Sequence, residues 1–511
     1  MMSGIVPISR ARNPFPQDGV TVDARGVPHL DELPSSLIAM LAVHVDARPD
    51  AEAVVELGGE RLTYRELWDR AARIAGGLRG RGLQRGDRVA VRYPAGVDWV
   101  LAFWGVLFAG GIVVAVNTRS SESEVAFLLD DSGASIDLAP GADLPVGDPF
   151  VDETATLTDV AALFYTSGTT GRPKGVPTTH EAFLTNTGNV ARCFAIPSDI
   201  GTDMRTLICV PLFHVTGCNS QLLVAAYYGG TAVIMPTLDV GALIGTLAAE
   251  RITFLVTVPA IYALMLRHAD FAGADTSTVR WLAYGGAPIA PSLVASLKRA
   301  FDAARVANGY GMTESASLMT VLPHEDAEDH ADSVGYAVPS VELGVAPFGD
   351  EPGFGELVVR GANITAGYWQ RPDATAETIV DGWLHTGDVV RVDDAGRVRI
   401  VDRTKDIINR GGENVSSIEV ESALMAVPGV LEAAVIAVPD DVLGEKVGAV
   451  IYTGGETIDV AEVIAAVSES IADFKVPQFV SVITEPLPRN PGGKIVKGRV
   501  RDSVVWGEAL R

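Results

Sequence analysis

Cysteine is scarce in this chain of 511 residues, which contains only Cys193, Cys209 and Cys218. Three cysteines at these spacings exclude a disulfide framework, and they lack the close pairing of a structural zinc site. A chain with so few thiols suits the reducing cytosol, so a cytoplasmic location is expected.

Basic charge is also in short supply. The 40 Lys and Arg residues face 64 Asp and Glu residues, which gives a formal net charge of −24. This balance disfavours a general affinity for nucleic acid, so no nucleic-acid partner is expected. A polyanionic ligand would need a local group of donors to bind.

Long apolar runs are nearly absent. Residues 1–19 contain prolines and no apolar run of signal-peptide length. Only residues 99–116 reach the length of a membrane span, and Gly110 and Gly111 interrupt them. We interpret this stretch as a buried helix followed by a buried parallel strand, and expect no stable membrane insertion.

The chain is long enough for two or more domains. Strand-like segments alternate with helical ones from residue 88 to residue 284, which predicts α/β subdomains built on parallel sheets. Short strands separated by turns at 355–360, 388–391 and 396–401 predict a small β-rich subdomain.

The last part of the chain has a different texture. Helical patterns at 417–426 and 460–471 flank strand-like stretches at 430–438 and 446–452, which predicts a small α+β domain. We place the boundary at Asp402, so that residues 1–401 form an N-terminal domain and residues 402–511 a C-terminal domain.

A loop rich in glycine and hydroxyl groups follows the apolar stretch 161–164. Glycines let successive backbone N–H groups converge on an anion, and hydroxyl groups add donors. Lys174 supplies a mobile charge suited to a phosphate tail, although the spacing is not that of a Walker loop. We therefore predict phosphate binding by Thr166, Ser167, Gly168, Thr169, Thr170 and Lys174.

From about residue 62 to residue 497, the chain resembles the adenylate-forming superfamily in its acyl-CoA synthetase branch. The resemblance rests on several motifs that stand in the order of that family. Besides the loop above, they are Pro211-Leu-Phe-His-Val-Thr-Gly217, Tyr284-Gly-Gly-Ala-Pro288, Asn308-Gly-Tyr-Gly-Met-Thr-Glu314, Gly382-Trp-Leu-His-Thr-Gly-Asp388, Asp402-Arg-Thr-Lys-Asp-Ile407, Gly411-Gly-Glu-Asn414 and Asn490-Pro-Gly-Gly-Lys494.

The motif at 308–314 suits a nucleotide. Tyr310 offers a face on which adenine can stack, and Asn308 offers an amide for the exocyclic amine, with Gly309 and Gly311 beside them. Thr313 has a hydroxyl group for the α-phosphate. Glu314 is an oxygen ligand suited to Mg²⁺.

Ribose and acid sites are expected elsewhere. A carboxylate such as Asp388 can accept hydrogen bonds from both ribose hydroxyls, and the resemblance implies that Arg403 assists. A lone histidine such as His214 is usually a packed core residue, but the resemblance implies that its ring borders the acyl pocket. Further expected pocket residues are Val258, Pro259, Tyr284, Gly285, Gly286, Ala287 and Met312.

Lys494 is the strongest catalytic candidate, because an ammonium group offsets the repulsion between an attacking carboxylate and the α-phosphate. It lies in a basic segment that also holds Arg489, Lys497, Arg499 and Arg501. The resemblance implies that the C-terminal domain is mobile about a hinge at Asp402. In its second position it would present Gly411, Gly412 and Glu413 to CoA.

Two departures from the family pattern stand out. Asn414-Val-Ser-Ser417 replaces a motif that ends in proline, and Ser417 is expected to serve as the helix N-cap. The motif at 490–494 has lost two hydroxyl groups but keeps its lysine.

The leading hypothesis is an acyl-CoA synthetase that uses ATP and Mg²⁺ to form acyl-AMP and pyrophosphate, and then transfers the acyl group to CoA. An adenylating ligase that loads a carrier-protein thiol is the alternative. A pseudo-enzyme is disfavoured because Lys494, Glu314 and Asp388 are all present. Fatty acid metabolism is the expected setting, but the acid, whether medium-chain fatty, branched or aromatic, and the oligomeric state remain open.

Overall fold

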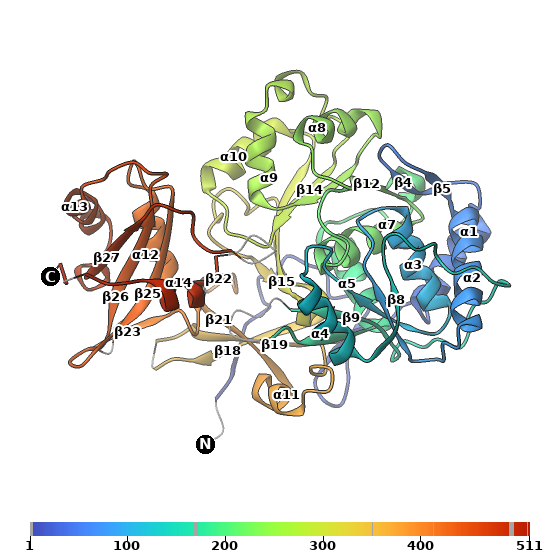
Figure 1. The fold of residues 1–511 in the computed structure, drawn as a ribbon, viewed down its shortest axis with the longest axis horizontal. Coiled ribbons are helices and arrows are strands. Elements are labelled where there is room, and N and C mark those ends of the chain that lie inside the picture. Colours follow the sequence, from blue (N-terminus) through green and yellow to red (C-terminus); the bar gives the residue numbers. More distant parts are fainter. Residues whose placement is uncertain are drawn as a thin grey trace.

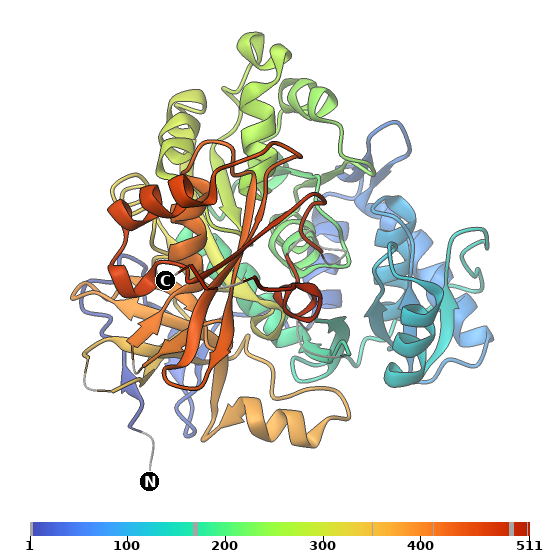
Figure 2. The same cartoon turned by 60° about the vertical axis from the view of Figure 1, so that its left-hand side comes forward.

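The computed structural model describes residues 4–166, 172–349, 351–411, 413–489, 495–507 and 509–510. A large N-terminal body and a smaller C-terminal unit stand side by side in Figure 1. The C-terminal unit comes forward when the molecule is turned (Figure 2). The predicted fold class, a large α/β part with a β-rich subdomain and a small α+β unit, is confirmed.

The largest sheet orders its strands β17-β16-β15-β14-β13-β11-β12-β4-β5. Neighbouring strands from β15 to β4 run parallel, and antiparallel pairs close both edges. The inner strands β11, β12 and β13 are buried along their whole lengths, as expected for a parallel sheet with helices on both faces. The strands are β4 (Glu52–Glu56), β5 (Arg61–Thr63), β11 (Arg205–Ile208), β12 (Thr231–Ile234), β13 (Phe254–Thr257), β14 (Trp281–Gly285), β15 (Arg305–Met312), β16 (Ser317–Leu322) and β17 (Tyr336–Ala337).

A second sheet has the order β10-β9-β7-β6-β8 and is parallel except for β10. Its strands are β6 (Arg88–Val91), β7 (Ile112–Ala115), β8 (Ala134–Leu138), β9 (Val160–Tyr165) and β10 (Gly175–Thr179). Residues 99–116 form most of α3 (Val97–Phe108) and then β7, as predicted, and every residue of α3 except Asp98 is buried. Within the described ranges, no helix has the length and apolarity needed to cross a bilayer.

The β-rich subdomain is antiparallel throughout its described pairs. Its strands are β1 (Val6–Pro7), β18 (Val341–Pro347), β19 (Phe354–Gly361), β20 (Ile379–Val380), β21 (Trp383–Val392) and β22 (Val398–Arg403). A separate hairpin pairs β2 (Val20–Val22) with β3 (Pro28–Leu30).

Capping residues in the sequence mark the starts of several helices in the N-terminal body. Thr63 and Ser121 each form a capping box with a glutamate three residues on. The helices are α1 (Leu37–Ala47), α2 (Tyr64–Gly80), α4 (Glu122–Ser132), α5 (His180–Cys193), α6 (Val215–Gly217), α7 (Leu223–Tyr228), α8 (Val240–Ala249), α9 (Pro259–Arg267), α10 (Pro291–Ala300) and α11 (Pro372–Thr378). Short helical turns are η1 (Gly201–Asp203), η2 (Cys218–Leu222), η3 (Ala269–Gly273) and η4 (Thr313–Ser315).

The C-terminal unit has a hydrophobic core of its own, which includes Val420, Leu424, Val435, Val447 and Val463. Its predicted elements lie within two residues of their expected starts. It contains β23 (Ile408–Arg410), β24 (Glu413–Val415), α12 (Ser417–Met425), β25 (Glu432–Asp440), β26 (Gly444–Tyr452), α13 (Val460–Ser470), η5 (Asp473–Lys475), β27 (Phe479–Ile483) and α14 (Lys497–Ser503).

The prediction that Ser417 caps α12 is wrong. The N-cap is Ser416, whose hydroxyl oxygen accepts a hydrogen bond from the Glu419 backbone N–H at 3.2 Å. The Ser417 hydroxyl instead donates to the Asp402 carboxylate at 2.7 Å. Either serine could serve as an N-cap. The Asp402 carboxylate binds the Ser417 hydroxyl, so Ser416 caps the helix.

A buried ion pair fixes the start of α14 against α12. The Lys497 ammonium lies 2.7 Å from a Glu421 carboxylate oxygen, and both side chains are about five-sixths buried. Lys497 also donates to the Ser417 hydroxyl. Burial raises the pKa of Glu421, while the Lys497 charge opposes that rise. The pair therefore matters most when Glu421 is ionised.

We expect Lys497→Met to destabilise the protein by about 3 kcal/mol near neutral pH, because it leaves a buried carboxylate without its cation. The loss should shrink as the pH falls towards about 5. In the variant, burial holds the pKa of Glu421 above its unfolded value, so the folded protein takes up a proton there and the buried charge disappears. Urea unfolding at both pH values measures this. Lys475→Met, which removes a more exposed pair with Glu419, serves as the control and should cost under about 1 kcal/mol. Equal losses for the two variants would contradict the account.

Candidate active site

The carboxyl ends of β13, β14 and β15 lie next to one another and bring several predicted site residues to one edge. Thr257 pairs with Tyr284, and Tyr284 with Asn308, so Val258 and Gly285 flank the start of the 308–314 motif. Ligands of open parallel sheets bind at this edge. The sheet topology therefore places two motifs, far apart in sequence, at one location.

Asp388 on β21 joins three elements through its carboxylate. The Tyr310 hydroxyl on β15 donates to one oxygen, and Arg403 on β22 makes an ion pair with the other at 2.7 Å. The Asp388 side chain is only 5% exposed, whereas Arg403 is half-exposed. Burial and the Asp388 carboxylate raise the pKa of the Tyr310 hydroxyl, so it stays protonated and donates. A carboxylate oxygen can accept more than one hydrogen bond, which is the property that the predicted ribose role of Asp388 requires.

Glu314 lies in a second polar group. Its Oε1 accepts a hydrogen bond from the Tyr368 hydroxyl at 2.9 Å, and the Lys174 ammonium stands 4.5 Å from the centre of the Tyr368 ring. Burial raises the pKa of Glu314, while Tyr368, Arg403 and Lys174 oppose that rise. The loop lysine and the predicted metal ligand are thus brought together around one aromatic ring.

The donor set fits magnesium when a nucleotide supplies the remaining ligands. In the described part of the chain, no group of three or more His, Cys, Asp or Glu side chains could hold a metal ion. Mg²⁺ usually binds one or two carboxylates together with substrate phosphates and water. Glu314, with Thr313 next to it and Lys174 nearby, matches that pattern.

The predicted phosphate loop connects two antiparallel strands. The Thr166 backbone N–H, just after the end of β9, donates to the carbonyl oxygen of Lys174, just before the start of β10, at 3.0 Å. Ser167, Gly168, Thr169 and Thr170 lie outside the described residues, and so do Gly412 and Lys494. Their predicted roles remain predictions.

The expected acyl-pocket residues are split between core and surface. Tyr284 is 1% exposed and packs in the core, as does Pro259, whereas Gly286 and Ala287 are exposed. A Cβ atom on Gly285 would lie 2.3 Å from the Gly309 carbonyl oxygen, so only glycine fits there. Val258, His214 and Met312 are half-buried, and the His214 ring lies 4.7 Å from that of Phe213.

The hinge candidate Asp402 touches both parts of the molecule. Its backbone pairs with Val389 of β21, while its carboxylate accepts hydrogen bonds from the backbone and hydroxyl of Ser417 at the start of α12. Gly411 and Glu413, the described part of the expected CoA motif, lie in the hairpin of β23 and β24, and Glu413 is exposed. Neither of them lies beside the Asp388 group in the described contacts.

Sequence reasoning missed Tyr368. The loop that carries it is tied to the site at both ends, since Thr365 N–H donates to the Glu314 carbonyl and Trp369 N–H to the Gly175 carbonyl, each at 2.8 Å. The only indication in the sequence is a glycine followed by two aromatic residues, Gly367-Tyr-Trp369. That pattern does not name its partners.

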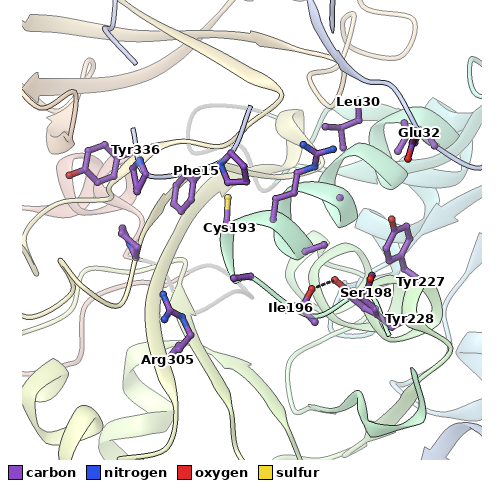
Figure 3. A pocket seen from close by; sticks show the side chains of 18 of the residues that line it. Phe15, Leu30, Glu32, Cys193, Ile196, Ser198, Tyr227, Tyr228, Arg305 and Tyr336 are labelled. Carbon is purple, nitrogen blue, oxygen red and sulfur yellow. Dashed lines mark hydrogen bonds between the residues drawn. The ribbon is translucent and has the colours of Figure 1, made fainter. Parts of the chain in front are cut away.

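A cavity of about 950 Å³ lies at the opposite end of β15. Figure 3 shows Phe15, Cys193, Tyr228 and Arg305 around it, and Arg305 is the first residue of β15. None of the described site residues above lines this cavity. Its position separates it from the edge where the motifs converge.

The geometry agrees with comparisons to known proteins. The model of the "AMP-binding enzyme" family matches residues 41–148 and 138–369, and that of the "AMP-binding enzyme C-terminal domain" matches residues 419–494. The chain belongs to the AMP-binding enzyme family.

Among curated relatives, a feruloyl-CoA synthase of Amycolatopsis is 40% identical over 480 residues, covering 89% of this chain and 96% of the relative. A long-chain-fatty-acid–CoA ligase of Mycobacterium tuberculosis is 34% identical over 499 residues, covering 91% and 97%. The solved o-succinylbenzoate CoA synthetase of Bacillus subtilis, with its acyl-adenylate intermediate, matches with a TM-score of 0.84 at 26% identity, covering 92% and 99%.

These relatives are CoA synthases or ligases, and this family member is an AMP-forming acid–CoA ligase. It uses ATP to activate a carboxylic acid and joins the acyl group to CoA. The alternative hypothesis of a ligase that loads a carrier protein is not favoured by them. Both the predicted family and the predicted type of enzyme are confirmed.

Because metal binding needs an ionised Glu314 and burial raises its pKa, we expect the KM for Mg²⁺ to fall as the pH rises from about 5 to about 7. Glu314→Gln should lose this pH dependence and lower kcat/KM by about 100-fold. Steady-state pyrophosphate release at varied Mg²⁺ measures both effects. Glu325→Gln removes an exposed carboxylate paired with Arg305 and should behave like the wild type. An unchanged Mg²⁺ dependence in Glu314→Gln would remove Glu314 from the metal site.

Proposed function

We propose that the acid and ATP meet at the carboxyl edge of β13, β14 and β15, with Asp388 and Glu314 as the two anchor points. The observation that carries this proposal is the pair of polar groups described above, Asp388 with Tyr310 and Arg403, and Glu314 with Lys174. Both groups involve the 308–314 motif. They could hold the ribose end and the phosphate end of one nucleotide.

In the first half-reaction, a carboxylate oxygen of the acid attacks the α-phosphorus of ATP. The bond between the α-phosphorus and the bridging oxygen breaks, and pyrophosphate leaves with that oxygen. Two anions approach each other, so cationic side chains lower the barrier. We assign Lys174 to the pyrophosphate tail, Thr313 to the α-phosphate and Lys494 to the reacting oxygens. Mg²⁺, when bound by Glu314, would neutralise phosphate charge.

In the second half-reaction, the CoA sulfur attacks the acyl carbon. A C–S bond forms, the C–O bond to AMP breaks, and the thiol proton is released to solvent. We propose that the C-terminal domain turns about Asp402 between the two steps, so that Gly411 and Glu413 face the CoA chain. The support for this is that Asp402 contacts both domains, through its backbone pairing with Val389 and its side-chain bonds to Ser417, as a residue at a hinge would.

For the acid, we propose an aromatic substrate of the feruloyl class in a cytoplasmic enzyme. The support is the 40% identity to a feruloyl-CoA synthase and the half-buried aromatic pair Phe213 and His214. Ferulate, a long-chain fatty acid and o-succinylbenzoate, each with ATP, Mg²⁺ and CoA, form the test panel. Ferulate should give the highest kcat/KM, measured as acyl-CoA by chromatography. A preference for the fatty acid would overturn the aromatic assignment and leave the ligase assignment intact.

Lys494→Ala should abolish acyl-AMP formation, with a loss of at least about 100-fold, because the attacking carboxylate then meets the phosphate without its cation. Thioester formation from supplied acyl-AMP should remain close to that of the wild type. The two half-reactions are measured separately by single turnover. Lys475, which pairs with Glu419, lies in the same domain. The control variant Lys475→Ala should leave the rates of both half-reactions unchanged. Equal loss of both half-reactions in Lys494→Ala would show that the lysine is structural.

Asp402→Pro restricts the backbone φ angle at the joint and should slow one half-reaction far more than the other. Asp402→Ala is the matched control, because it also removes the carboxylate that bonds Ser417 but leaves the backbone free. Both variants should lose stability, and only Asp402→Pro should separate the half-reactions. If both variants retain wild-type ratios of the two rates, rotation does not occur at Asp402.

A further inference from the structure

The turn between η4 and β16 follows Thr313 and Glu314 directly, and its backbone is strained. Ala316 has φ of 51° and Ser317 has φ of 122°, a region that residues with a Cβ atom rarely adopt. Strand β15 lies so close that a Cβ atom on Gly311 would be 1.4 Å from the Ser317 carbonyl oxygen. Two consecutive residues in this conformation persist only where surrounding contacts hold them.

Buried amide side chains from two other elements hold this turn. Asn219 Nδ2 of η2 donates to the Ala316 carbonyl oxygen at 2.8 Å, and Asn186 Oδ1 of α5 accepts from the Leu318 backbone N–H at 3.0 Å. Both asparagines are 0% exposed. Asn186 Nδ2 also donates to the backbone carbonyl oxygen of Asn219 at 3.2 Å, so Asn186 also holds the backbone of the helical turn that carries Asn219.

Other polar contacts complete the bracket around the turn. The hydroxyl groups of Ser220 and Ser317 lie 2.8 Å apart. Asn363 Nδ2 donates to the carbonyl oxygens of Ser315 and Leu318, each at 2.8 Å. A buried hydrogen-bond network of this kind selects one backbone arrangement, because every broken contact leaves an unpaired polar group in the interior.

Asn219 differs from the other members because of its position in the chain. It lies on η2, a π-helical turn that directly continues α6, whose N-cap residue is His214. π-helical turns are rare and are frequently found at functional sites. Asn219 therefore joins the segment beginning at His214, which is expected to border the acid, to the turn following Glu314.

We propose that Asn219 is a positioning residue that holds the Thr313–Glu314 loop in place and links it to the helix that begins at His214. This inference rests on the proposed roles of Glu314 and His214. Cutting the Asn219–Ala316 contact lets the strained turn relax, which moves Glu314 away from the metal and the phosphates. It also frees the helix that carries the acid site from the nucleotide site.

The test uses Asn219→Ala in the full-length enzyme. The KM for ATP and the KM for Mg²⁺ should each rise about tenfold or more, with a smaller rise in the KM for the acid, in the pyrophosphate-release assay. Asn189→Ala is the matched control. Asn189 is also 0% exposed and lies on α5, but its amide bonds the Ser340 hydroxyl at 2.8 Å, away from this turn. It should lower Tm while keeping wild-type KM values.

Asn219→Ser provides a variant that folds more readily. Its hydroxyl group is too short to reach Ala316 but can bond a carbonyl of its own helix, so no buried donor is left unpaired. It should show the same rise in KM for ATP. Wild-type KM values for ATP and Mg²⁺ in the folded Asn219 variants, or the same change in Asn189→Ala, would overturn the proposal.

Failure of the site assignment gives a different result. If Glu314→Gln is fully active, the role of Glu314 fails irrespective of Asn219. If Glu314→Gln is impaired while Asn219→Ser keeps its KM for ATP, the proposal for Asn219 alone is wrong.

Discussion

The buried carboxylate of Asp388 is the contact on which the arrangement of the site depends. It receives Tyr310 from the large sheet and Arg403 from the last strand before the C-terminal unit. A carboxylate this deeply buried must keep its donors, because an unpaired buried charge costs several kcal/mol. The same atoms therefore hold three parts in fixed positions relative to one another: the 308–314 motif, the β-rich subdomain, and the end of β22 that leads into the C-terminal unit.

The rest of the site extends from that contact along the 308–314 motif. Tyr310 sits at the Asp388 end, and Glu314 at the other end faces Tyr368 and Lys174. Behind Glu314, the strained turn is bracketed by Asn219 and Asn186. One strand and its following turn thus connect the proposed ribose, metal and acid positions, which suits an enzyme that must align an acid with a phosphate.

Much of the fold could be predicted because local patterns decide it. The apolar runs of β6, β7 and β11 to β14 belong to strands buried on both faces, and the α12 and α13 patterns predict helices wherever their apolar faces are covered. Ser416 shows the limit of this reasoning. The residue that caps α12 depends on Asp402, which lies 15 residues from Ser417 and whose side chain no local pattern places there.

The candidate site was predicted wherever a motif names its own chemistry, as for Asp388, Glu314 and Lys174. Tyr368 and Asn219 could not be found in this way, since their partners Glu314 and Ala316 are 54 and 97 residues away. Their roles arise from packing between elements. An asparagine on a helix gives no local indication that it holds a distant carbonyl group.

The central claim is that this chain forms an acyl-adenylate before CoA takes part. Exchange of labelled pyrophosphate into ATP tests it most directly. With Mg²⁺ and an accepted acid, the exchange should proceed without CoA and stop when the acid is left out. Exchange that needs CoA, or that proceeds equally without the acid, would contradict the account.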